Sequence, residues 1–102
     1  MIAHIGVIRV LTSDDALAVA AHGRAIEERY GIPAVSRCIP GQPHGIHDDE
    51  SERRAETEIV ALARELAADG AAALVISCAA DPALERTREA VDVPVIGAGS
   101  AA

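Results

Sequence analysis

The sequence is almost free of aromatic residues: Tyr30 is the only one, and neither tryptophan nor phenylalanine occurs. Half of the 102 residues are nevertheless hydrophobic, so a core has to be built from alanine, valine, isoleucine and leucine. A chain of this length holds one domain with one modest core, and we expect residues 1–102 to form a single lobe. A flavin site is disfavoured because Tyr30 is the only ring that could stack on such a cofactor.

Lysine is also absent, so the nine basic residues are all arginines, and the formal net charge is −7. This acidic balance argues against nucleic acids and anionic membranes as partners. No apolar run is long enough for a membrane-spanning helix, and the first residues lead directly into a strand rather than into a signal peptide. We therefore expect a soluble cytoplasmic domain.

Only two cysteines are present, Cys38 and Cys78. Their spacing fits no zinc motif, so the sequence predicts no metal site. The two thiols could form one disulfide, but nothing in the sequence indicates an oxidising compartment.

Hydrophobic periodicity and turn signals divide the chain into alternating strands and helices. The expected strands cover residues 4–10, 34–38, 71–78 and 93–96, and the expected helices begin near Thr12–Asp15, Asp48 and Asp81. This order predicts an α/β fold of the flavodoxin-like kind, with a parallel four-stranded sheet in the order 2-1-3-4 and helices on both faces. Residues 97–102 resemble a loop and the start of another helix, so we expect part of one sheet face to lack its cover.

Two of the helices should turn an apolar stripe toward the sheet. In the first helix the stripe is Val19, Gly23, Ile26 and Tyr30, and in the second it is Ala55, Ile59, Leu62, Ala63 and Leu66. Gly23 on such a stripe suggests a close approach of helix and sheet. The third helix is expected to turn Leu84 inward.

The segment 39–47 contains two prolines and two glycines, which exclude a regular element. Long connections of this kind are more often functional than idle, and this one should lie at the carboxyl edge of the sheet. His44 and His47 could act there as acid or base groups. The alternative is that both are simply solvated loop residues.

Cys78 ends an unbroken aliphatic run, which is typical of a strand buried on both faces. Asp81 and Pro82 then resemble a helix cap and a first helical residue. Cys78 should therefore sit at the carboxyl edge of a central strand, where open α/β sheets bind ligands, just before a helix start that favours its thiolate. The alternative is a buried cysteine that serves as a small hydrophobe.

Two further residues near this edge, Arg9 and Thr12, have two interpretations each. Arg9 could pair with a ligand carboxylate or could simply face solvent. Thr12 could offer its hydroxyl to a ligand or could cap the first helix. Cys38 ends the second strand and ranks below Cys78 because no helix start follows it.

The motif Ser77-Cys78-Ala79-Ala80-Asp81-Pro82, followed by Arg88 and by 93–97, resembles the aspartate/glutamate/hydantoin racemase superfamily. The segments 36–39, 42–43 and 45–46 are similar to its hydantoin racemase branch. Members of this superfamily have two lobes, each with a cysteine, and this chain resembles the N-terminal lobe. A second cysteine in a Gly-Cys-Thr setting is absent, as is the C-terminal helix that packs on the first lobe. Many hydantoin racemases carry Asn-Pro-Asn-Thr after the first strand, and of these residues only Thr12 is present.

The resemblance implies racemisation without a cofactor, by removal and return of a proton next to a carbonyl. Cys78 would be one of the two proton-transfer groups. The backbone N–H groups of Ala79 and Ala80, with Arg9 and Thr12, would bind a small substrate that carries a carboxylate or a hydantoin ring. An isolated lobe should be nearly inactive, and a homo-oligomer could bring two copies of Cys78 together.

Two other function classes remain open on the sequence alone. One is a module that binds a small carboxylate without turning it over. The other is a receiver-like signalling domain, which is disfavoured because Cys78 stands where the phospho-accepting aspartate would be.

Overall fold

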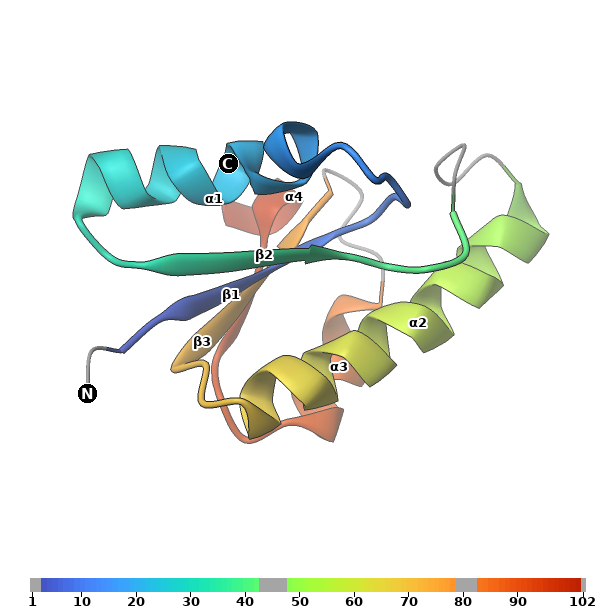
Figure 1. Cartoon of the computed structure of the whole chain (residues 1–102). Coiled ribbons are helices and arrows are strands. Elements are labelled where there is room, and N and C mark those ends of the chain that lie inside the picture. Colours follow the sequence, from blue (N-terminus) through green and yellow to red (C-terminus); the bar gives the residue numbers. More distant parts are fainter. Residues whose placement is uncertain (1–2, 43–47, 79–82, 102) are drawn as a thin grey trace.

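The structure, a computed structural model, describes residues 3–42, 48–78 and 83–101. Its elements alternate between strands and helices along the chain (Figure 1). In order they are β1 (Ile5–Arg9), α1 (Ala16–Tyr30), β2 (Ala34–Cys38), α2 (Asp49–Ala68), β3 (Ala73–Ser77), α3 (Leu84–Ala90), β4 (Val95–Gly97) and α4 (Ala98–Ala101).

The four strands form one parallel sheet in the order β2-β1-β3-β4. This confirms the predicted fold class and strand order. β2 also has the predicted bounds, whereas β4 is shorter and begins at Val95. Pro94 has no N–H to donate, but its carbonyl accepts from the Leu74 N–H at 2.9 Å. The short α4 confirms that a helix begins after β4.

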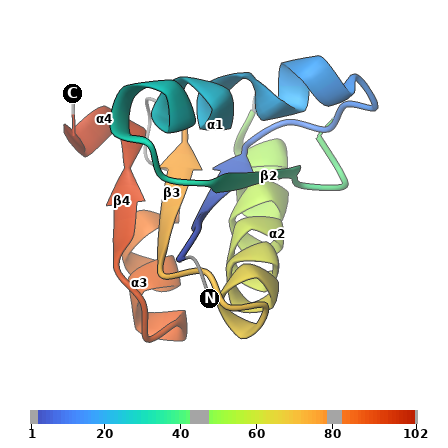
Figure 2. The same ribbon diagram turned by 60° about the vertical axis from the view of Figure 1, so that its left-hand side comes forward.

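Helices cover the two faces of the sheet unequally (Figure 2). α2 and α3 pack on one face, where Ile8, Leu74 and Ile76 are fully buried. α1 lies on the other face, and there Val75 and Ser77 of β3 are only half-buried. The prediction that this strand is buried on both faces is therefore wrong for the face of α1, because one helix does not cover the width of the sheet.

α2 follows the predicted pattern from cap to core. Asp48 accepts a hydrogen bond from the Ser51 backbone N–H at 2.7 Å, and the Ser51 hydroxyl accepts one from the Asp48 N–H at 3.0 Å, which forms a capping box. The five residues of the predicted apolar stripe are all buried, namely Ala55, Ile59, Leu62, Ala63 and Leu66.

α1 departs from the prediction at both ends. Asp15 caps it by accepting from the backbone N–H groups of Leu17 and Ala18, so the cap is not Thr12. Tyr30 is 64% exposed rather than inward-facing, because it is the last helical residue before the left-handed Gly31. Gly23 is buried against β2, which confirms the close approach of helix and sheet.

α3 begins later than predicted. Asp81 and Pro82, which suggested a cap and a first helical residue, lie outside the described residues. The helix starts at Leu84, and Ala83 precedes it in the left-handed conformation with φ of 58° and no side-chain cap. Leu84 packs against the core only in part, whereas Thr87 is the residue of α3 that is buried.

Several apolar side chains remain exposed on this lobe. Leu17 on α1 is 70% exposed, and Ile96 on β4 and Val35 on β2 are each 43% exposed. Among the described residues, no helix is long and apolar enough to cross a membrane.

Candidate active site at the carboxyl edge of the sheet

The candidate residues gather where three neighbouring strands end. The strand register places Arg9, the last residue of β1, opposite Cys38 of β2 and Ser77 of β3. Cys78 follows Ser77 directly, and Thr12 lies three residues beyond Arg9. The parallel sheet therefore brings Thr12 and Cys78 to the same edge, as predicted.

Cys78 is a free, half-buried thiol whose side chain packs against the hydrophobic core. Its backbone N–H donates to the Ile76 carbonyl at 3.0 Å, so the chain turns immediately after β3. Ala79 and Ala80, the predicted ligand-binding backbone groups, lie outside the described residues. The predicted helix start beside the thiol, Asp81 and Pro82, also lies outside the described residues, and the described helix α3 begins at Leu84.

Arg9 is buried rather than solvent-facing, with 8% of its surface exposed. One guanidinium nitrogen, Nη1, donates to the carbonyl of Ala18 and, at 3.0 Å, to that of Val19. The Nε atom is buried without a partner, and no carboxylate pairs with Arg9 in the part of the chain that the structure describes. A buried cation of this kind normally has an anionic partner, so its free edge favours an anionic group at this end of the sheet.

Thr12 forms hydrogen bonds with the loop that follows β2. Its hydroxyl donates to the Ile39 carbonyl and accepts from the Gln42 N–H at 2.6 Å, while the Gln42 carbonyl accepts from the Thr12 N–H at 2.8 Å. A hydroxyl offers one hydrogen and two lone pairs, so one lone pair remains for a ligand.

His22 and Ser77 form a contact that the sequence analysis missed. Nδ1 of His22, on α1, lies against Oγ of Ser77 at the end of β3. His22 is exposed as a whole, but partial burial of its ring, and secondly the charge of Arg9, lower its pKa below the ordinary value of 6.5. No local signal marks this pair, because the two residues are 55 positions apart and His22 lies off the apolar stripe of α1.

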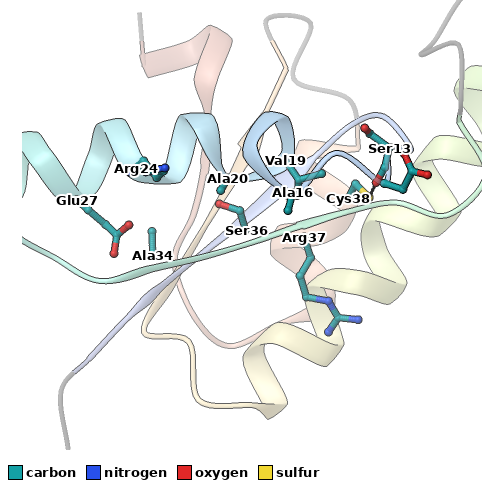
Figure 3. A pocket seen from close by; sticks show the side chains of 11 residues that line it. Ser13, Ala16, Val19, Ala20, Arg24, Glu27, Ala34, Ser36, Arg37 and Cys38 are labelled. Carbon is teal, nitrogen blue, oxygen red and sulfur yellow. Dashed lines mark hydrogen bonds between the residues drawn. The ribbon is translucent and has the colours of Figure 1, made fainter.

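Cys38 lies apart from Cys78, on the α1 side of the edge strand β2. Its thiol donates to the Ser13 carbonyl at 3.5 Å. It also lines an open groove of about 380 Å³ between α1 and β2, in which Ser36 and Cys38 point toward the helix and Arg37 points away from it (Figure 3). Cys78 is not among the residues that line this groove.

The described residues offer no group of ligands of the kind that metal ions require. Within residues 3–42, 48–78 and 83–101, no three histidine, cysteine or acidic side chains come together in a way that could hold a metal ion.

The structure is an α/β lobe in which the Cys78 thiol, the buried Arg9 guanidinium and the hydroxyls of Thr12 and Ser77 lie at the carboxyl edge of the sheet. The family model described as Asp/Glu/Hydantoin racemase matches residues 5–102, so the chain belongs to this racemase family, as its motif suggested.

A solved structure supports this assignment. Allantoin racemase from Klebsiella pneumoniae superimposes with a TM-score of 0.80 at 29% sequence identity. The match covers 93% of this chain and 39% of that one, so the chain spans about two-fifths of the length of the enzyme it resembles. A search of curated proteins finds no significant match.

Proposed function

We propose that this chain is one lobe of a cofactor-independent racemase in which Cys78 transfers the proton. The observation that carries the proposal is the position of Cys78. It is a free thiol at the carboxyl end of a central strand, in a chain of a racemase family. Open α/β sheets bind ligands at this edge.

In the proposed reaction the Cys78 thiolate takes the proton from a carbon next to a carbonyl. The electron pair of the broken C–H bond moves onto the carbonyl oxygen, which becomes an enolate oxygen. A second protonated group on the opposite face then returns a proton to the same carbon, and the carbonyl re-forms with inverted configuration. Thiols suit both roles because their pKa can be brought near the operating pH.

The proposed substrate class is a hydantoin ring, with acidic amino acids as the alternative. The allantoin racemase relative makes allantoin, which contains a hydantoin ring, the first compound to test. Thr12 retains one acceptor lone pair, and Arg9 a buried unpaired N–H, for such a ligand. The backbone N–H groups of Ala79 and Ala80 complete the proposed binding set.

One lobe supplies the proton-transfer group on one face of the substrate carbon. We propose that residues 1–102 correspond to the N-terminal lobe, and that the opposing group comes from a second lobe or from a second copy of the chain. The isolated chain should then remove a proton from one enantiomer but should racemise very slowly.

Ligand protection of the thiol tests where the substrate binds. We expect hydantoin or allantoin to slow the alkylation of Cys78 by iodoacetamide, measured by mass spectrometry of each cysteine. Cys38 is the internal control, because it lies two strands away and should alkylate at an unchanged rate. Equal protection of both thiols, or protection of neither, would contradict the proposed site.

A binding module without catalysis is the second candidate, and the unpaired charge of Arg9 favours it. Such a module would protect Cys78 from alkylation as well. It would leave the substrate's α-proton in place in heavy water, whereas a racemase lobe exchanges it.

A further inference from the structure

His22, Arg9 and Ser77 come from three different elements and converge at the end of β3. α1 passes over the carboxyl end of this strand (Figure 2). Nδ1 of His22 on α1 lies against the Ser77 hydroxyl. Arg9 lies beside Ser77 in the strand register, and its charge acts on His22. Ser77 is joined directly to Cys78, so the cluster adjoins the proposed proton-transfer group.

We propose that His22 is a positioning residue that makes Ser77 a hydrogen-bond acceptor for a ring N–H of the substrate. The neutral imidazole accepts the Ser77 hydroxyl hydrogen at Nδ1, which leaves only lone pairs on the Ser77 oxygen. The inference rests on the proposed function and narrows its substrate class to cyclic ureides with a free N–H, such as hydantoins. A carboxylate oxygen in the same place would meet lone pairs and be disfavoured.

The protonation state of His22 supports this assignment. Burial and the guanidinium of Arg9 both disfavour the imidazolium, so the ring is neutral near pH 7 and has one acceptor nitrogen. One turn away on α1 the neighbours are uncharged, namely Ala18, Val19, Ala25 and Ile26. α4 carries no charged residue, and of the described residues Cys78 is the titratable group joined directly to Ser77.

A structural role alone would predict a different outcome. The contact between His22 and Ser77 also ties α1 to β3, so its loss should lower stability in either case. A simple tether would leave the choice between ligands unchanged, whereas a positioning role ties that choice to the Ser77 oxygen and to the protonation of His22.

The experiment compares binding of hydantoin and of its N-methylated analogues to the full chain by NMR titration. We expect the wild type to prefer hydantoin, and Ser77→Ala to weaken hydantoin binding by about 3–10-fold while hardly affecting the methylated analogue. Lowering the pH through the titration of the His22 ring, which the same NMR spectra follow, should remove the preference in the wild type, since an imidazolium cannot accept the hydroxyl hydrogen.

His22→Asn is the matched control. Its amide oxygen can accept from Ser77 at the place of Nδ1 but does not titrate, so the preference should persist at the low pH at which the wild type loses it. If hydantoin protects Cys78 yet the preference is the same in the wild type, Ser77→Ala and both pH values, this inference is overturned and the proposed function stands. If no hydantoin binds at all, both are overturned.

Discussion

Arg9 shows how a single buried charge influences the residues around it. Its guanidinium is held by two carbonyl oxygens of α1, and no carboxylate of the described residues neutralises it. Burial of such a charge is costly, and a buried positive charge disfavours a second positive charge beside it. His22 is the described group on which this effect is seen.

Replacing Arg9 by methionine should raise the pKa of His22, because it removes the repulsion of the imidazolium. The rise should be partial, since burial is the larger cause and remains. NMR titration of the His22 ring measures it, with Arg24→Met on the exposed side of α1 as the control. An unchanged His22 pKa in Arg9→Met would show that the two side chains do not interact.

The same pKa gives the sign of a pH effect on stability. The folded pKa of His22 lies below the unfolded value, so the unfolded chain binds more protons as the pH falls through about 6.5. The contribution of His22 to the free energy of unfolding is therefore fully present above pH 6.5 and is lost as the pH falls below that value. Arg9→Met should make this part of the pH dependence shallower.

The contact between α1 and β2 depends on one residue, Gly23. Gly23 is the only residue of α1 that is buried. A Cβ at this position would overlap the Ser36 hydroxyl and lie 3.3 Å from the Ala34 methyl. The contact surface is thus set by the absence of a side chain.

Gly23→Ala should therefore lower the free energy of unfolding by about 1 kcal/mol. The steric cost of overpacking, about 1–3 kcal/mol, exceeds the gain of about 1 kcal/mol in helix propensity. Adding Ser36→Ala should recover much of the loss, because the overlapping hydroxyl is then gone. Chemical denaturation measures both, and Ala21→Gly on the exposed side of α1 reports propensity alone. Stabilisation by Gly23→Ala would show that α1 does not approach the sheet so closely.

Elements defined by local patterns could be predicted from the sequence. The aliphatic strands and the stripe of α2 follow from short-range periodicity, and parallel βαβ connections have few allowed topologies. The start of α3 could not, because a strong local signal at Asp81 and Pro82 is followed by a helix that begins only at Leu84. Tyr30 was misplaced because periodicity does not show where a helix stops being covered by the sheet.

The arrangement of the candidate site could be predicted only in part. Cys78 and Thr12 follow from the rule that parallel strands end at one edge. The contact between His22 and Ser77 and the burial of Arg9 depend on how α1 lies across the sheet, which no local pattern encodes.

For the whole molecule, the uneven cover of the sheet is the main feature. α2 and α3 cover one face, whereas α1 lies on the other. Exposed apolar side chains at Leu17 and Ile96 lie on this second side of the lobe, and such surfaces favour association.

We expect the chain to self-associate in sedimentation velocity experiments, through the side that carries Ile96. Ile96→Glu should weaken association because it places a charge in the apolar contact. Val35→Glu, an equally exposed position on the opposite edge strand, should have little effect. The proposed association through the Ile96 side would be contradicted by a chain that stays monomeric at high concentration. It would also be contradicted if only Val35→Glu weakened association.

The central claim is that Cys78 moves the proton. The most direct measurement follows the loss of the α-proton signal of each enantiomer of allantoin, 5-substituted hydantoins, aspartate and glutamate in heavy water by NMR. The account predicts slow exchange of one enantiomer of a hydantoin with little racemisation, abolished in Cys78→Ala and retained in Cys38→Ala. Exchange that survives in Cys78→Ala would contradict it.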